Sequence, residues 1–148
     1  MAYATYTDVQ AHFTHITFGA GTTPSTMNIT EWLALAESIL NGLLVSRGVG
    51  VPVEGTHPNA FHICKRLVTL NASARAAEAL FYGVEPAEND QAARLWDEYW
   101  QLYREIEKNP RFMYDASITR PTMKTYAIDE WGTADAADQP RMDFNEKF

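Results

Sequence analysis

The segment NITEWLALAESILNGLLVSRGVG, residues 28–50, carries the clearest helical pattern in the chain. Asn28 and Glu31 have the spacing of a capping box, in which each side chain bonds the other residue's backbone amide. Gly48 and Gly50 predict the C-terminal end of this helix, because glycine readily adopts the left-handed backbone conformation that terminates helices. Steps of three and four predict one apolar stripe, made of Ile29, Trp32, Leu33, Ala36, Ile39, Leu40, Leu43 and Leu44. We therefore predict an amphipathic helix over residues 28–47.

Two longer helical patterns follow this segment. Pro58 suits the first turn of a helix, where its missing N–H costs nothing, and the apolar spacing then continues to Gly83. Residues 71–79 of this pattern hold five alanines, whose small side chains let a neighbouring helix approach closely. A third helix is expected from about Asp90 to the Asn109-Pro110 break. Its apolar stripe is Leu95, Trp96, Tyr99, Leu102, Tyr103 and Ile106.

The N-terminal quarter predicts one more, shorter element. Residues 6–13 have the pattern of a short helix capped by Thr7, and residues 19–26 predict a flexible, polar and exposed loop. The fold class expected from these patterns is all-α: a small helical bundle of three main helices plus a short N-terminal helix, spanning residues 1–109.

Residues 110–148 are rich in aromatic residues and methionine but follow no helical period. We predict an extended, irregular C-terminal arm that buries these side chains against other subunits. Trp100 is added as a candidate because it lies about 100° around the third helix from Tyr99, and a helix that is apolar on several sides needs several neighbours. The candidate interface residues are Arg111, Phe112, Met113, Tyr114, Tyr126, Trp131, Phe144, Phe148 and Trp100.

Composition narrows the class of partner. A length of 148 residues favours one domain, and 12 basic against 19 acidic side chains give a net charge of −7. Such a surface repels phosphates on average, so a helical DNA-binding regulator is disfavoured, although Lys65, Arg66 and Arg75 share one helix. No apolar run approaches the roughly 18 residues of a membrane span, and the N-terminus lacks the features of a secretion signal.

The chemistry-bearing residues do not form a recognisable catalytic pattern. His12 and His15 stand at i and i+3, and would share a helix face, but no third metal ligand accompanies them. His57 and His62 flank a helix start and point apart. The single cysteine, Cys64, lies on the apolar stripe and predicts a buried, inert thiol in a chain from a reducing cytoplasm. We expect no enzyme activity, no cofactor and no metal. The alternative is a small helical enzyme or ligand-binding module that uses the histidines.

Three features together carry a resemblance over residues 3–83. They are the opening YATYTDVQAHF (residues 3–13), the capped helix rich in leucine and alanine over residues 32–44, and a proline-bounded loop leading into the alanine-rich helix that ends near Tyr82-Gly83. In these the chain resembles the head-to-tail connector (adaptor, or head-completion) proteins of long-tailed double-stranded DNA phages. It departs from them in the length of the loop over residues 19–26 and of the tail.

That resemblance implies a structural role rather than catalysis. It implies a dodecameric ring, a homo-oligomer that binds the portal protein of the filled head and a tail-side connector or tail-terminator protein. DNA would then be only a passing occupant of the channel that the ring extends, and no membrane would be involved. The expected location is the head-tail neck of the virion, assembled in the cytoplasm of the bacterial host. The acidic balance suits such a channel, because phosphates slide past a wall that repels them.

Overall fold

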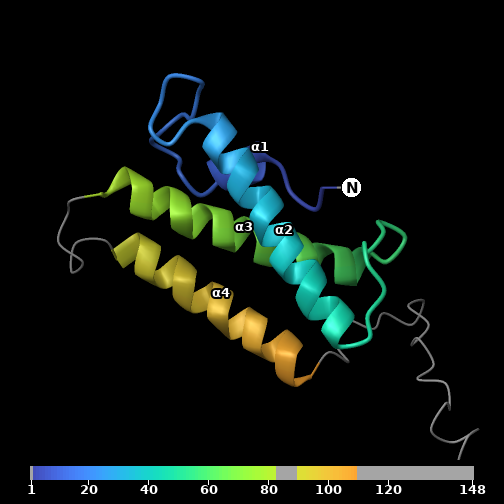
Figure 1. The fold of residues 1–148 in the computed structure, drawn as a ribbon. Coiled ribbons are helices and arrows are strands. Elements are labelled where there is room, and N and C mark those ends of the chain that lie inside the picture. Colours follow the sequence, from blue (N-terminus) through green and yellow to red (C-terminus); the bar gives the residue numbers. More distant parts are fainter. Residues whose placement is uncertain (1, 83–89, 110–148) are drawn as a thin grey trace, which may run out of the picture.

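The computed structural model describes residues 2–82 and 90–109, and these form four helices and no strand (Figure 1). The helices are α1 (Tyr6–Gln10), α2 (Thr26–Ser46), α3 (Pro58–Leu80) and α4 (Asp90–Lys108). The predicted all-α class, with three main helices and a short N-terminal one, is confirmed. The arm predicted over residues 110–148 lies outside the described residues.

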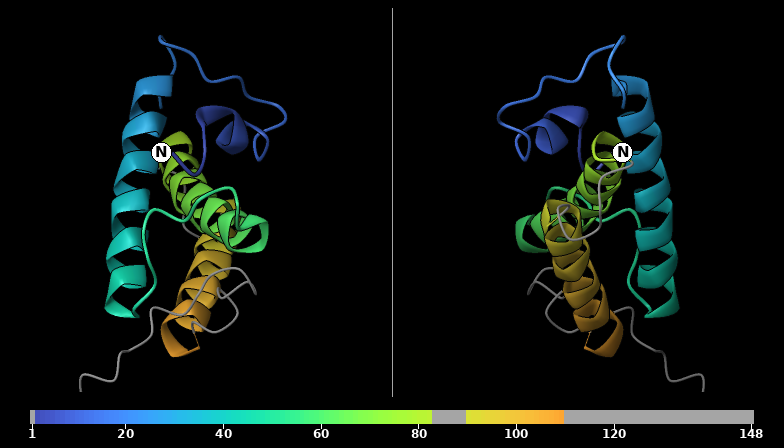
Figure 2. Two further views of the ribbon diagram at one scale, coloured as in Figure 1. Left: turned by 90° about the vertical axis from the view of Figure 1, so that its right-hand side faces the viewer. Right: turned by 90° about the vertical axis from the view of Figure 1, so that its left-hand side faces the viewer.

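Helix α3 is the central element of the bundle. Helix α2 packs on one side of it, α4 packs along another, and the short α1 rests on α2 and α3 (Figures 1 and 2). Residues 67–74 of α3 are all buried, as expected for a helix with neighbours on several sides. Ala72, Ala74, Ala76 and Ala77 have no exposed surface, which confirms the close packing predicted for the alanine-rich half. The helix ends at Leu80, three residues before the predicted stop at Gly83.

Helix α2 begins two residues earlier than predicted. Ser25 is the capping residue: the Asn28 amide donates to Ser25 Oγ at 3.3 Å, and Asn28 Oδ1 accepts from the Ser25 amide at 3.1 Å. Asn28 therefore closes the capping box from inside the helix, and Glu31 has no part in it. The predicted stop is confirmed at Gly48, whose φ of 75° lies in the left-handed region.

The apolar stripe of α2 also differs from the prediction in two positions. Ile29, Leu33 and Leu40 are buried as expected, whereas Trp32 is half-buried and Ile39 is exposed. By length and composition alone α2 could cross a membrane, although the sequence holds no long apolar run. The core helix of a globular bundle passes the same test, and the buried stripe of α2 packs against α3. This finding therefore carries no argument for a membrane.

The N-terminal helix is shorter than expected. It ends at Gln10 rather than near residue 13, and its cap is Thr5 instead of Thr7. The Asp8 carboxylate accepts a hydrogen bond from the Thr5 amide at 2.8 Å, which satisfies an amide that the helix itself leaves without a partner.

The loop over residues 19–26 was predicted to be exposed, and this holds for Ala20, Gly21 and Thr23 only. Pro24 is fully buried. The Thr22 hydroxyl accepts from the Gly19 amide at 2.9 Å and donates to the Pro24 carbonyl at 2.7 Å. Local side-chain hydrogen bonds of this kind fix a turn in one conformation. The prediction of an exposed loop fails at Pro24, because composition alone does not reveal these contacts.

A buried tyrosine joins the N-terminal segment to the loop between α2 and α3. The Tyr3 hydroxyl donates to Asn41 Oδ1 at 3.0 Å and accepts from the Val53 amide at 2.8 Å. Val49 and Val53 from that loop are buried as well. Irregular segments thus complete the core that the helices begin.

Candidate functional site

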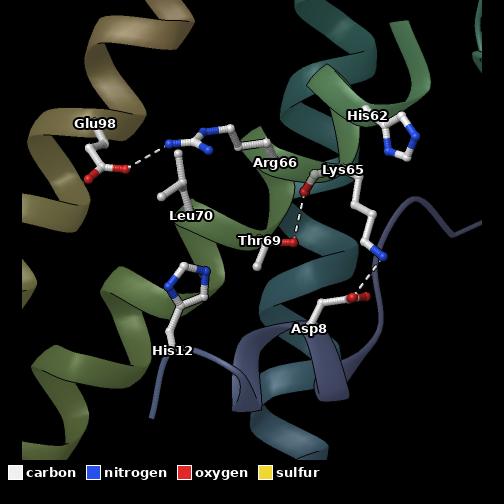
Figure 3. Close-up of a pocket in the computed structure, with 8 residues that line it drawn as sticks. All are labelled: Asp8, His12, His62, Lys65, Arg66, Thr69, Leu70 and Glu98. Atoms are coloured by element: carbon white, nitrogen blue, oxygen red, sulfur yellow. Dashed lines mark hydrogen bonds and ion pairs between the residues drawn. The ribbon is translucent and has the colours of Figure 1, made fainter. Parts of the chain in front are cut away.

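A groove lies where α1, α3 and α4 meet, and its lining includes Lys65, Arg66 and two of the four histidines (Figure 3). Its volume is about 420 Å³. It is lined by Asp8, His12, His62, Lys65, Arg66, Thr69, Leu70 and Glu98. The basic residues of α3 thus face acidic residues from two other helices.

Two ion pairs cross this groove. Lys65 Nζ lies 2.7 Å from Asp8 Oδ1, which ties α3 to α1, and Arg66 Nη2 lies 3.2 Å from Glu98 Oε2, which ties α3 to α4. Partial burial raises the pKa of Asp8, but the hydrogen bonds from Lys65 and Thr5 outweigh it, so the net shift is below the ordinary value.

The histidines do not form the group that their spacing predicted. His12 and His15 follow the end of α1 in a turn, so they share no helix face. His12 and His62 line the groove, whereas His57 precedes α3 as its capping residue. Desolvation lowers the pKa of His12, Glu98 opposes this shift, and Arg66 adds to it. Among residues 2–82 and 90–109, His, Cys, Asp and Glu form no cluster of three or more suited to a metal ion.

Two further polar groups in and beside the groove bond within the bundle. The Thr69 hydroxyl donates to the Lys65 carbonyl at 2.8 Å, so its proton points back into α3. Gln91 Nε2 donates to the His12 carbonyl at 3.1 Å. With its charges paired across three helices, this arrangement can hold α1 against α3 and α4. We regard the groove as an ion-paired seam of the bundle.

Cys64 is buried, as predicted. Burial raises the pKa of its thiol to about 12. A thiol with such a pKa carries almost no thiolate at neutral pH, and the thiolate is the reactive form.

A polar and aromatic network joins α3 to α4. The buried Asn71 side chain accepts from Arg75 Nε at 3.0 Å and also bonds Tyr99. The Arg75 guanidinium lies 5.9 Å from the centre of the Trp96 ring, and Trp96 Nε1 donates to Glu78 Oε1 at 2.7 Å. Trp96 and Tyr99 of α4 therefore each have a polar partner on α3.

Trp100 belongs to a different part of the same aromatic cluster. It stacks on Trp96 with ring centres 6.4 Å apart and meets Tyr99 edge to face at 5.0 Å, yet 45% of its surface is exposed. Of the nine predicted interface residues, Trp100 is the one that falls within the described residues. Arg111, Phe112, Met113, Tyr114, Tyr126, Trp131, Phe144 and Phe148 lie outside them.

The outer face of α2 is a second exposed apolar surface, and the sequence analysis missed it. Met27, Leu35, Ile39 and Val45 are all exposed, and 71% of the Met27 surface is open to solvent. Beside Met27 lies a hollow of about 480 Å³, lined by Tyr6, Thr26, Met27 and Thr30. Only a correct prediction of the helix start at Thr26 would have placed Met27 on this face, because the predicted start at Asn28 left Met27 in a loop.

Comparison with known proteins adds no relative. The chain matches no family model, no curated protein and no solved structure.

Proposed function

We propose that this protein is a structural component of a phage particle, a ring-forming connector that joins the portal of the filled head to the tail. The proposal starts from the resemblance over residues 3–83. The observation that carries it further is the apolar surface left over outside a complete core. The buried core extends from Tyr3 to Ile106, yet Met27 and Trp100 remain exposed, and a further 39 residues rich in aromatic side chains follow Asn109.

In this proposal, exposed residues such as Met27 and Trp100 contact other subunits. Covering exposed apolar surface against a partner is favourable by about 25 cal/mol per Å² before the cost of ordering. In this proposal the C-terminal segment, residues 110–148, binds the portal, and the helical bundle makes the ring.

The test is portal binding by a chain that ends at Asn109. We expect this truncation to abolish co-purification with the portal while the helical circular-dichroism signal, normalised per chain, stays nearly unchanged, because all four described helices lie before residue 110. A matched control keeps residues 110–148 but shuffles their order, so that composition and charge are preserved. Portal binding that survives truncation refutes the role of the segment. Equal binding by the shuffled chain shows general stickiness and refutes specific recognition.

A further inference from the structure

Two exposed apolar features of the bundle lie on different helices. One is the hollow beside Met27 at the start of α2, and the other is Trp100 on α4. Helix α3 packs against both α2 and α4. The hollow is lined by residues of α1 and α2, so it and Trp100 are separate surfaces, and each is available to a different neighbour.

Charge fixes which surfaces match. Glu31 lies one helical turn after Met27, and Arg104 lies one turn after Trp100. Both side chains are exposed, and neither has an ion pair within residues 2–82 and 90–109. With Trp100 of one copy in the hollow of the next and the two helices running in the same direction, Arg104 comes opposite Glu31. The opposite direction brings Asp97 to Glu31, and like charges facing each other across an interface are unfavourable.

We propose that α4 of one copy docks on the start of α2 of a second copy, with Trp100 filling the hollow lined by Tyr6, Met27 and Thr30, and Arg104 pairing with Glu31. The contact uses two different surfaces, so it is head-to-tail, and repetition of such a contact generates a closed ring or an open filament. This inference rests on the proposed function only for the closure of the ring. The contact itself follows from the shape and charge of the two surfaces.

The experiment measures self-association of the purified full chain, without portal, by sedimentation velocity over a series of concentrations. We expect Trp100→Ala to weaken association about thirtyfold or more, the loss typical of a tryptophan at the centre of an interface. The control is Tyr82→Ala, which removes an aromatic side chain that is 92% exposed and lies outside both surfaces. Circular dichroism of each variant checks the fold.

Charge reversal gives a second, independent test on exposed positions. Glu31→Arg and Arg104→Glu should each weaken association, and the chain that carries both should recover it, since the ion pair is restored in the reverse sense. Failure of the double variant to recover association, while each single variant is weakened, overturns the proposed pairing.

Mixing two defective variants tests the head-to-tail geometry. Trp100→Ala keeps the hollow, and Met27→Glu keeps Trp100, so a mixture of the two has one intact contact and should form dimers that grow no further. A wild-type chain that stays monomeric overturns the inference, as does association that Trp100→Ala leaves unchanged. If association survives Trp100→Ala but disappears in the chain truncated after Asn109, the C-terminal segment mediates association and the proposed contact is overturned. None of these results depends on portal binding, so this inference and the proposed function fail separately.

Discussion

Replacing Ser73 with alanine should make the bundle more stable. Ser73 lies in the middle of α3 with no exposed surface, and its hydroxyl has no hydrogen-bond partner among residues 2–82 and 90–109. A serine within a helix often bonds the carbonyl four residues earlier, and Ser73 does not make that bond. The folded state therefore carries a buried polar group that water satisfied in the unfolded chain.

The magnitude follows from three contributions. A buried, unsatisfied hydroxyl costs roughly 1–3 kcal/mol, and the higher helix propensity of alanine adds up to about 0.7 kcal/mol. Loss of the packing contacts of one oxygen atom opposes these gains by a few tenths of a kcal/mol. We expect Ser73→Ala to raise the free energy of unfolding by about 1–3 kcal/mol and Tm by roughly 2–12 °C.

Urea unfolding followed by circular dichroism measures this change. The matched control is Ser38→Ala in α2, where an exposed hydroxyl donates to the Ala34 carbonyl at 3.0 Å. The control gains the same helix propensity but relieves no buried group, so it should change the free energy of unfolding by less than about 0.5 kcal/mol. If Ser73→Ala stabilises no more than Ser38→Ala, or destabilises, the hydroxyl has a partner in solution and the reasoning is refuted.

Three further predictions concern the seam, the buried acids and the aromatic network. Lys65→Met should lower the free energy of unfolding by no more than about 1 kcal/mol, because both partners of the Asp8–Lys65 pair are partly exposed. It should also raise the pKa of Asp8 toward its ordinary value, which NMR titration measures, and an unchanged Asp8 pKa contradicts the pairing. Burial raises the pKa values of Cys64 and Tyr3 to about 12, so the folded chain keeps protons that the unfolded chain releases at high pH. The free energy of unfolding should therefore fall as the pH rises from about 9 toward 12, and urea unfolding that gives the same value across that range contradicts the prediction. Trp96→Phe should lower the free energy of unfolding, measured in urea, by about 1 kcal/mol, because it removes the hydrogen bond to Glu78. Trp100→Phe removes no such bond among the described contacts and should lower it less, so equal losses of stability would argue against the network.

The helices were predictable because their cause is periodic. Steps of three and four in the apolar residues located α2, α3 and α4 and identified most of the buried stripe, including Leu33, Leu40 and Cys64. Their ends were less certain. Ser25 and Asn28 are both good capping residues, and only the three-dimensional bond pattern shows that Ser25 stands outside the helix and Asn28 inside it.

The seam and the irregular part of the core were not predictable in the same way. Asp8 meets Lys65 and Glu98 meets Arg66 across long sequence separations, and no periodic pattern encodes such pairs. Tyr3 and Pro24 lie in segments without helical spacing, so their burial depends on tertiary contacts alone. The outer face of α2 escaped notice for a related reason: a helix with one complete stripe gives no cause to inspect its remaining residues.

Stability and assembly therefore use different residues in this chain, and this separation can be tested. The core from Tyr3 to Ile106 is continuous without any contribution from the exposed surface of Met27 or from the exposed side of Trp100. Met27→Glu should accordingly leave the free energy of unfolding of the monomer within about 0.5 kcal/mol of wild type, while it abolishes self-association. Ser73→Ala should change the free energy of unfolding and leave self-association unchanged, since it acts on a buried group that no partner can reach. If Met27→Glu unfolds the bundle, the outer face of α2 belongs to the fold, and the argument that it exists for a neighbouring subunit is lost.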